Sequence, residues 1–368
     1  MPRSRRVWEA LAWLTLSAAG ALAGEPLTLD QLVERHVAAR GGLGALHAIK
    51  TLTFSRRGSK GPEPAMVKMR PYYFMVGCTE AECGYAEGFD GSAWEASTKR
   101  QRMIRARGEA AKAIRRAGEF DDPIIGWREK GHTAALRGIE DFQGQAAYRV
   151  DMVLNDGLPM TCYFDPRTFL MLGNRRSVPE HARGPHLDTI TRWENYRPVA
   201  GFLYPFTTVQ QDVQTGAIDR GEWATIEANR PYEPSFFTPP PMTPSASTRL
   251  ALHLLSIAKS IGSAEQWFAA YRGFRADPAN ASVDTERDLD WLGYEMLKDG
   301  EIAKALLAFE TDIVEHPASA NAYDSLGDGW IQAGRPVDAI DAFGKALQLA
   351  PDAKDTARKL GALTRSAR

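Results

Sequence analysis

The chain has 368 residues, enough for two domains of average size that can each bury a hydrophobic core. Its 45 Lys and Arg residues nearly balance its 46 Asp and Glu residues, which excludes the basic excess of a dedicated nucleic-acid-binding protein. The hydrophobic fraction of 44% and the charged fraction of 25% exclude a wholly disordered chain.

The first 23 residues have the pattern of a signal peptide. Arg3, Arg5 and Arg6 form a positive start, and the mainly apolar run that follows is shorter than the roughly 20 residues of a membrane-spanning helix. The small residues Ala21 and Ala23 are typical of a signal-peptidase site. We therefore expect cleavage after Ala23, no transmembrane segment in the mature chain, and a location in the periplasm or the extracellular space.

Two short helices are predicted at the start of the mature chain. Thr28 or Asp30 is the candidate N-cap of the first helix, and apolar residues at helical spacing follow it. Gly41 ends that helix, and residues 43–49 form the second. His36 is expected to pack at the helix surface.

Short segments rich in aromatic and β-branched residues begin at Leu52 and are separated by glycine-containing turn signals. One helix interrupts them around residues 109–116. The pattern predicts an α+β domain over residues 24–237, built on an antiparallel sheet of many strands. The clearest predicted strands are residues 65–69, 72–76, 147–153 and 160–164.

The three cysteines are consistent with export, which permits disulfides. Cys78 and Cys83 flank a short acidic segment and are predicted to form a local disulfide, which leaves Cys162 as a buried thiol. A metal site needs more ligands than this pair supplies, and no histidine lies near it in the sequence. We therefore expect neither a metal nor a cofactor.

A proline-rich segment at residues 238–247 divides the chain. Its four prolines can continue neither a helix nor a strand, because proline lacks the backbone donor and fixes φ. We predict an extended linker here. Residues 248–368 have helical character throughout, so the predicted fold class is α+β followed by all-α.

The sharpest pattern is an internal repeat of 34 residues. Residues 286–319 and 320–353 align without a gap and match the tetratricopeptide pattern, in which small residues let two antiparallel helices approach and large residues fill the seam. The grooved face of such an array commonly binds a protein partner, although two full repeats also suit a stabilising appendage. The matching positions are Leu289, Leu292, Gly293, Met296, Ala305, Phe309 and Pro317 in the first copy and Tyr323, Leu326, Gly327, Trp330, Ala339, Phe343 and Pro351 in the second.

No complete catalytic or cofactor signature occurs in the sequence. Ser256 and Lys259 match the S-x-x-K pattern of penicillin-recognising enzymes, and Ser319 with Asn321 resembles their second motif. Both pairs lie in the helical part, without the α/β domain that such enzymes use. We therefore expect a protein that is not an enzyme, with a hydrolase only as a remote alternative.

Two polar groups have a structural and a functional interpretation. Glu119, Asp121 and Asp122 form an acidic cluster, but an acid–base role needs burial, so capping a helix or anchoring a lid is favoured. His181 and His186 bracket a loop between strands and lack a third histidine. A solvated loop is favoured over a metal site.

Seven short motifs follow one another along the β part: residues 39–43 (ARGGL), 49–52 (IKTL), 87–95 (EGFDGSAWE), 121–125 (DDPII), 130–132 (KGH), 163–171 (YFDPRTFLM) and 195–205 (NYRPVAGFLYP). In this order, the β part resembles the outer-membrane lipoprotein-sorting superfamily, the LolA-like periplasmic carriers. The resemblance implies a curved, incomplete antiparallel β-barrel, with helices over its open side and a cavity that takes acyl chains. The added repeat array departs from the single-domain carriers.

Aromatic and apolar side chains in or beside the strands are the candidate ligand contacts. They line the cavity of an open barrel, whereas they fill a closed one as ordinary core. We predict a binding or carrier protein whose β domain takes a lipid or acylated ligand and whose repeats dock a protein partner. The alternative is a non-catalytic scaffold of an envelope assembly. The predicted ligand-binding residues are Phe89, Trp94, Ile124, Trp127, Tyr148 and Phe169.

Overall fold

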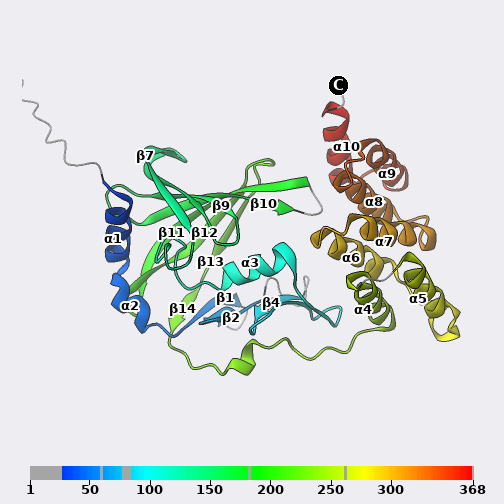
Figure 1. The fold of residues 1–368 in the computed structure, drawn as a ribbon, viewed down its shortest axis with the longest axis horizontal. Helices are drawn as coiled ribbons and strands as arrows, with labels where there is room; N and C mark the ends of the chain where they lie inside the picture. Colours follow the sequence, from blue (N-terminus) through cyan, green and yellow to red (C-terminus); the bar gives the residue numbers. More distant parts are fainter. Residues whose placement is uncertain (1–26, 59–60, 77–83, 181–183, 261–262, 367–368) are drawn as a thin grey trace, which may run out of the picture.

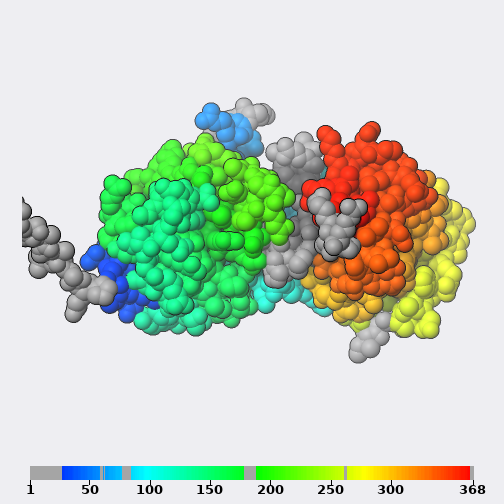
Figure 2. Space-filling view, turned by 90° about the horizontal axis from the view of Figure 1, so that it is seen from above, coloured from blue at the N-terminus to red at the C-terminus, as the bar shows by residue number. Residues whose placement is uncertain are grey.

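The computed structural model describes residues 27–58, 61–76, 84–180, 184–260 and 263–366. Strands and three helices form a first lobe up to residue 228, and helices form a second lobe from residue 246. The two lobes lie side by side (Figure 1, Figure 2). The predicted signal peptide and the predicted Cys78–Cys83 disulfide lie outside the described residues. No described helix is long and apolar enough to cross a membrane.

The first lobe contains two antiparallel sheets of seven strands each. In spatial order, sheet A consists of β14 (Thr225–Ala228), β1 (Thr51–Gly58), β2 (Gly61–Met69), β3 (Tyr72–Val76), β4 (Tyr85–Phe89), β5 (Ala93–Ser97) and β6 (Arg102–Arg105). Sheet B consists of β13 (Ile218–Glu222), β12 (Phe202–Asp212), β11 (Gly184–Val199), β10 (Met171–Glu180), β9 (Pro159–Phe164), β8 (Gln145–Val153) and β7 (Thr133–Phe142).

The two sheets meet where the chain passes from β13 to β14. The backbone N–H of Trp223 donates to the carbonyl of Phe206 in sheet B, and the next N–H, of Ala224, donates to the carbonyl of Ser55 in sheet A, both at 2.8–2.9 Å. At the far edges, β6 and β7 are not paired with each other. The barrel is therefore not closed, and the expected combination of antiparallel sheets followed by a helical region is confirmed.

Helices α1 (Leu29–Arg40) and α2 (Gly42–Ala48) pack against β12. Thr28, one of the two predicted N-caps, accepts from the backbone of Gln31, whose side chain accepts in return from the backbone of Thr28. Gly41 ends α1 at φ 117°. A Cβ atom there would lie 2.1 Å from the carbonyl oxygen of Gly201, so only glycine lets this turn approach the β11–β12 turn.

Helix α3 (Gly108–Gly118) connects β6 to β7 and lies on the face of sheet A that looks toward sheet B (Figure 1). Its one apolar face explains this position, because Ile114 is buried against Tyr73 of β3 and Ala93 of β5. The helix therefore fills part of the space between the sheets.

The chain after β14 covers the opposite face of sheet A (Figure 1). Its short 3-10 helix η1 (Pro234–Phe237) places Phe237 over Tyr72, with 5.5 Å between the ring centroids. Because neighbouring strand residues point to opposite faces, Tyr72 meets η1 while Tyr73 meets α3. The strongly apolar β3 is thus covered on both sides.

The second lobe repeats a pair of helices. Helices α6 and α8 begin at residues 286 and 320, and α7 and α9 begin at residues 302 and 336, so both offsets are 34 residues. In each pair a glycine faces a phenylalanine: a Cβ atom would lie 2.2 Å from the Phe309 ring at Gly293 and 2.4 Å from the Phe343 ring at Gly327. The helices are α4 (Ala246–Lys259), α5 (Ala264–Ala276), η2 (Pro278–Asn280), α6 (Glu286–Lys298), α7 (Ile302–Glu315), α8 (Ala320–Gln332), α9 (Pro336–Leu349) and α10 (Lys354–Ser366).

The lobes are joined through the β5–β6 edge of sheet A. Ile104 of β6 packs against the apolar core of the helical lobe. The amino group of Lys298, at the end of α6, lies 3.3 Å from a carboxylate oxygen of Glu95 on β5. The end of α6 therefore lies beside the space between the two sheets.

Candidate functional site

A cavity of about 810 Å³ lies between the two sheets. Side chains from β1 and β2 form one wall and side chains from β10, β11 and β12 form the other, with α3 and residues 119–123 between them. The volume falls within the roughly 300–1,000 Å³ of small-molecule sites. Ala113 of α3 lines the cavity and is exposed, so the cavity opens to solvent beside this helix.

Large apolar side chains occupy much of the cavity wall. Leu52 and Phe54 of β1 are buried there, with Met66 of β2 beside them. The indole rings of Trp193 on β11 and Trp223 between β13 and β14 line the same space. Covering apolar surface of a ligand with such a wall stabilises it by roughly 25 cal/mol per Å².

One region of sheet B interrupts this apolar lining, and we call it the β10 polar patch: Asn174, Arg176 and Thr189. Asn174 and Arg176 are two residues apart on β10 and therefore share a face, and Thr189 of β11 lies directly opposite Arg176. Asn174 and Arg176 line the cavity, while Thr189 is 2% exposed on the same face.

Each member of the β10 polar patch has a buried polar atom without a hydrogen-bond partner among the described residues: Oδ1 of Asn174, Nε of Arg176 and Oγ1 of Thr189. Leaving such an atom unpaired costs roughly 1–3 kcal/mol, so native proteins seldom keep several of them together without a ligand or water. The patch therefore has the properties of a preformed polar recognition site.

The guanidinium of Arg176 has no carboxylate within ion-pair distance in the part of the chain that the structure describes. Burial lowers its pKa below the ordinary arginine value, and the positive charge of Arg116 lowers it further. Arg116 itself is paired with Asp156. Arginine stays protonated even so, and it therefore presents an uncompensated positive charge to the cavity.

A second cation, Lys68 of β2, lines the cavity on the side of sheet A. Its amino group donates to the carbonyl oxygen of Glu119 at 2.7 Å. Burial lowers the pKa of Lys68 to about 8, although the nearby carboxylates of Glu119, Asp122 and Asp121 act in the opposite direction. Its charge is therefore more easily lost than that of an exposed lysine.

Asp122 fixes the segment beside the cavity to helix α1. Its Oδ2 lies 3.0 Å from Nε2 of His36 and is also paired with Arg40, whose Nε donates to the carbonyl of Leu203 at 2.7 Å. Burial alone would raise the pKa of Asp122, but Arg40 and His36 hold it well below its ordinary value. His36 is fully buried, which corrects the expectation of a surface position.

None of the six predicted ligand-binding residues is in the cavity wall. Four of them, Ile124, Trp127, Tyr148 and Phe169, pack in the apolar core that includes Leu32 of α1. The rings of Tyr148 and Phe169 are stacked with their centroids 6.3 Å apart. These four residues therefore pack as ordinary core, which is the second interpretation that the aromatic and apolar side chains allow.

Phe89 and Trp94 lie on opposite faces of sheet A. Phe89 packs in the cluster beneath α3. Trp94 is fully buried on the other face, where its indole N–H donates to the carbonyl of Phe237 at 2.9 Å. Trp94 therefore lies outside the cavity, because the sequence does not say which face of a strand becomes the inner one.

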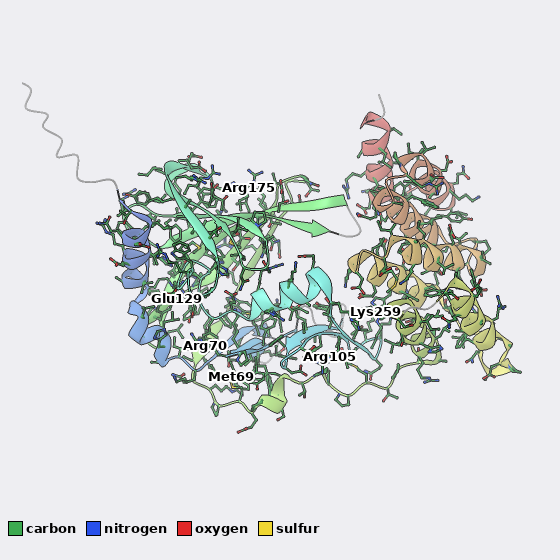
Figure 3. All side chains as sticks on the ribbon, in the orientation of Figure 1. Met69, Arg70, Arg105, Glu129, Arg175 and Lys259 are labelled. Carbon is green, nitrogen blue, oxygen red and sulfur yellow. The ribbon has the colours of Figure 1, made fainter. Side chains whose placement is uncertain are left out.

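The residues that do form the polar part of the site were not predicted. Their only sequence signal is the spacing of Asn174 and Arg176, two polar residues that share one face of a strand. The intervening Arg175 is exposed and lies on the outside of the sheet (Figure 3). Which of the two arginines is internal depends on the curvature and packing of the sheet.

The residues of the S-x-x-K pattern do not form a catalytic site. Ser256 is exposed on α4, and the amino group of Lys259 is paired with Asp299 at 2.9 Å. Ser319 caps a different helix, α8, and donates to Glu286 at 2.6 Å. Lysine held by a carboxylate is a poor base for activating a serine.

Comparisons with known proteins concern solved structures, because no protein-family model and no curated protein matches the chain. A putative outer-membrane lipoprotein-sorting protein domain from Vibrio parahaemolyticus is 12% identical, with a TM-score of 0.38, over 57% of this chain and 96% of that one. A LolA superfamily protein from Nitrosomonas europaea is 12% identical, with a TM-score of 0.36, over 58% and 99%. A DUF1329 family protein from Desulfovibrio piger is 9% identical, with a TM-score of 0.32, over 58% and 98%.

Proposed function

We propose that this protein is an exported, non-catalytic binding or carrier protein whose first lobe takes an amphiphilic ligand. The ligand would have an apolar chain, such as an acyl chain, and an anionic group. The observation that carries the proposal is the β10 polar patch, with its unpartnered buried atoms, of which Asn174 and Arg176 line the wall of a largely apolar cavity of about 810 Å³.

The apolar chain would lie along the wall that includes Leu52, Phe54 and Met66. These side chains already form a continuous surface with the indole of Trp223, so an apolar ligand adds contacts without rearranging the core. Ordinary solutes with no apolar part would leave this surface in contact with water. The site is therefore selective for amphiphiles over small polar anions.

The anionic group would be bound by Arg176. A guanidinium without a carboxylate partner pairs strongly with a carboxylate or phosphate, and low local dielectric strengthens that interaction. The free Oδ1 of Asn174 and hydroxyl of Thr189 accept hydrogen bonds, and they therefore suit a headgroup that also carries a donor. A carboxylate beside a hydroxyl or an amide N–H has this chemistry.

The second lobe would dock a protein partner. The 34-residue offset of its helix pairs supports a tetratricopeptide array with repeats at 286–319 and 320–353. We assign residues 24–237 to the ligand-binding domain, 238–247 to the linker and 248–368 to the helical domain. Export to the periplasm rests on the predicted signal peptide at residues 1–23.

Quenching of tryptophan fluorescence by brominated fatty acids tests the ligand proposal. Bromine on the acyl chain should quench the tryptophan fluorescence of the mature protein. Replacing Trp193 and Trp223 by phenylalanine should remove most of that quenching, because both indoles line the cavity. Trp330→Phe in the helical lobe is the matched control and should leave the quenching unchanged.

A second variant tests the cavity by filling it. Ala117 of α3 lines the cavity, so Ala117→Trp should abolish uptake of the brominated acid, whereas Ala357→Trp on exposed α10 should not. Uptake that survives Ala117→Trp, or no saturable quenching in the unaltered protein, would refute the proposal. The second result would favour a non-catalytic scaffold.

A further inference from the structure

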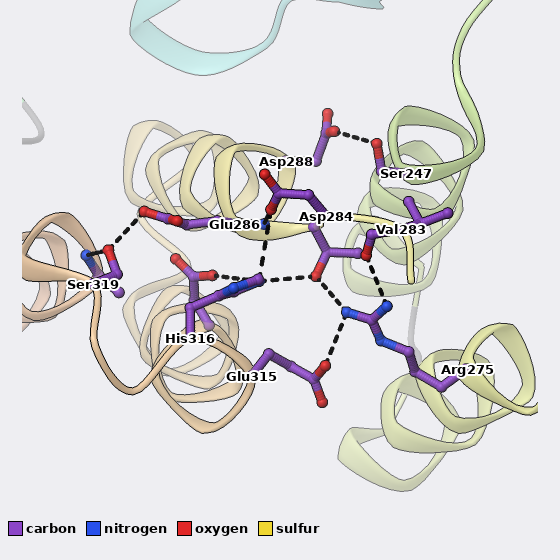
Figure 4. A network of polar contacts seen from close by, with 12 residues as sticks. Ser247, Arg275, Val283, Asp284, Glu286, Asp288, Glu315, His316 and Ser319 are labelled. Atoms are coloured by element: carbon purple, nitrogen blue, oxygen red, sulfur yellow. Dashed lines mark hydrogen bonds and ion pairs between the residues drawn. The ribbon is translucent and has the colours of Figure 1, made fainter. Parts of the chain in front are cut away.

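The junction of α6 and α7 brings together acidic and histidine side chains that are separated in the sequence. Asp284 and Glu286 lie at the start of α6, and His316 follows the last residue of α7 (Figure 4). One donor atom from each of the three lies within 4.8 Å of the others. Nε2 of His316 is 4.0 Å from Oδ1 of Asp284.

A third carboxylate faces this group from the protein interior. Asp312 of α7 is fully buried, and neither of its oxygens has a hydrogen-bond partner among the described residues. Its Oδ1 lies 3.9 Å from the same Nε2 of His316. A buried carboxyl group is normally paired, protonated or metal-bound, so an unpartnered one that faces an imidazole offers a place for a cation.

The neighbouring charges do not supply that cation. Arg275 is drawn beside this group in Figure 4, and it forms an ion pair with Glu315 at 2.9 Å. Its guanidinium also donates to the carbonyls of Asn280 and Val283 and to the hydroxyl of Thr285. Burial raises the pKa of Asp312 to about 8, and the carboxylates of Asp290, Glu286 and Asp284 raise it further.

We propose that Asp284, Glu286 and His316 bind a divalent transition-metal ion, with Asp312 facing it from the buried side. The combination of one imidazole with carboxylates suits Zn²⁺, because Ca²⁺ and Mg²⁺ take oxygen ligands. In a tetrahedral zinc site with bonds of about 2.0–2.1 Å, neighbouring donor atoms lie about 3.3 Å apart. The present separations, at most 4.8 Å, would close to this value by side-chain rotations. The exposed Asp284 would give up the hydrogen bond that its Oδ1 accepts from the backbone N–H of Glu286 at 3.0 Å.

The metal would clamp the first helix pair. It would join the start of α6 to the end of α7, replacing the contact in which Thr285 Oγ1 lies 3.3 Å from Nε2 of His316. The clamp is specific to the first repeat, because the three positions that lie 34 residues after the proposed ligands all hold alanine. These positions are Ala318, Ala320 and Ala350.

Isothermal titration calorimetry of the untagged mature protein with Zn²⁺ tests the site. We expect one Zn²⁺ per chain, with affinity at least roughly tenfold weaker in His316→Gln and in Asp312→Asn. Asp284→Asn, at an exposed position, should also weaken binding and keeps the test valid if the buried variant does not fold. His253→Gln, an exposed histidine on α4, is the matched control and should bind as the unaltered protein does.

Thermal unfolding supplies a second readout. Zn²⁺ should raise the midpoint of unfolding in the unaltered protein and in His253→Gln, but not in His316→Gln, because a metal that binds only the folded chain stabilises it. No stoichiometric Zn²⁺ uptake, or uptake that His316→Gln and Asp284→Asn leave unchanged, would overturn the proposal. Preferential uptake of Ca²⁺ over Zn²⁺ would also overturn it.

Discussion

Arg102 of β6 places its guanidinium 3.6 Å from the centre of the Trp291 ring on α6. The same guanidinium lies 3.4 Å from Oδ1 of Asp288. The carboxylate of Asp288 also accepts hydrogen bonds from the hydroxyls of Ser247 and Thr248 on α4. Burial lowers the pKa of Arg102 to about 10, although Asp288 acts in the opposite direction. A half-buried cation thus holds the open edge of sheet A against the helical lobe.

Arg102 and Trp291 should be energetically coupled. In a double-mutant cycle of Arg102→Ala and Trp291→Ala, we expect a coupling energy of about 1–2 kcal/mol, because the guanidinium is partly desolvated over the ring. The measurement is urea unfolding of the four proteins. Lys99→Ala, an exposed neighbour, should show no coupling to Trp291→Ala. Additive effects of the first pair would contradict the contact.

Arg176→Leu should reduce the affinity for a brominated fatty acid by roughly tenfold or more, since a charge-assisted pair contributes about 1.5–3 kcal/mol. Affinity for the corresponding neutral alcohol should not fall. Arg175→Leu, which removes the exposed neighbour, is the matched control. Equal losses in the two variants would show that general charge, and not the β10 polar patch, recognises the anion.

Replacing Lys68 should stabilise the protein near neutral pH. The pKa of Lys68 is lowered to about 8 in the folded chain, against 10.5 ordinarily, so its charged form destabilises the fold. Lys68→Met should raise the free energy of unfolding at pH 7 by roughly 2 kcal/mol. Between about pH 8 and 10.5 the unfolded chain binds the proton more tightly than the folded chain does. The free energy of unfolding of the unaltered protein should therefore rise with pH in this range until it approaches that of Lys68→Met. Urea unfolding at about pH 7, 9 and 10.5 measures it, and a constant difference would be inconsistent with the lowered pKa.

Asp122→Asn should destabilise the first lobe at pH 7. It leaves the buried guanidinium of Arg40 without its counter-charge, which costs roughly 3 kcal/mol. The pKa of Asp122 is lowered in the folded chain, so this stabilisation is present above the ordinary aspartate pKa and is lost as the pH falls through the lower, folded value. The difference in the free energy of unfolding between the unaltered protein and Asp122→Asn should therefore become smaller at acid pH. Urea unfolding at about pH 7 and pH 3 checks this, with Asp141→Asn, an exposed aspartate, as the control.

Two glycines of the helical lobe should respond in opposite directions to alanine. At Gly327 a Cβ atom would lie 2.4 Å from the Phe343 ring, so Gly327→Ala should destabilise the lobe by about 1–3 kcal/mol. At Gly344 nothing lies within 4 Å, and Gly344→Ala should stabilise α9 by up to about 1 kcal/mol through helix propensity. Thermal unfolding monitored by circular dichroism distinguishes them. A neutral Gly327→Ala would contradict the close approach of α8 and α9.

The positions of the helices could be predicted from the sequence because their signals are local. The 34-residue spacing and the capping residue Thr28 are each read directly along the chain, and the structure has helices at those places. The same is true of the strands, whose alternation and turn residues act over a few positions. An antiparallel, many-stranded fold followed by helices was therefore within reach of the sequence.

The identity of the site residues depended on tertiary structure. Strand alternation divides Arg175 from Arg176, but the curvature of the sheet decides which of the two faces the cavity. The same holds for His316 and Asp284, which are far apart in the sequence and meet only when α6 and α7 pack. Burial then changes the chemistry, because Arg176 and Asp312 have buried polar atoms that no other described protein group pairs with.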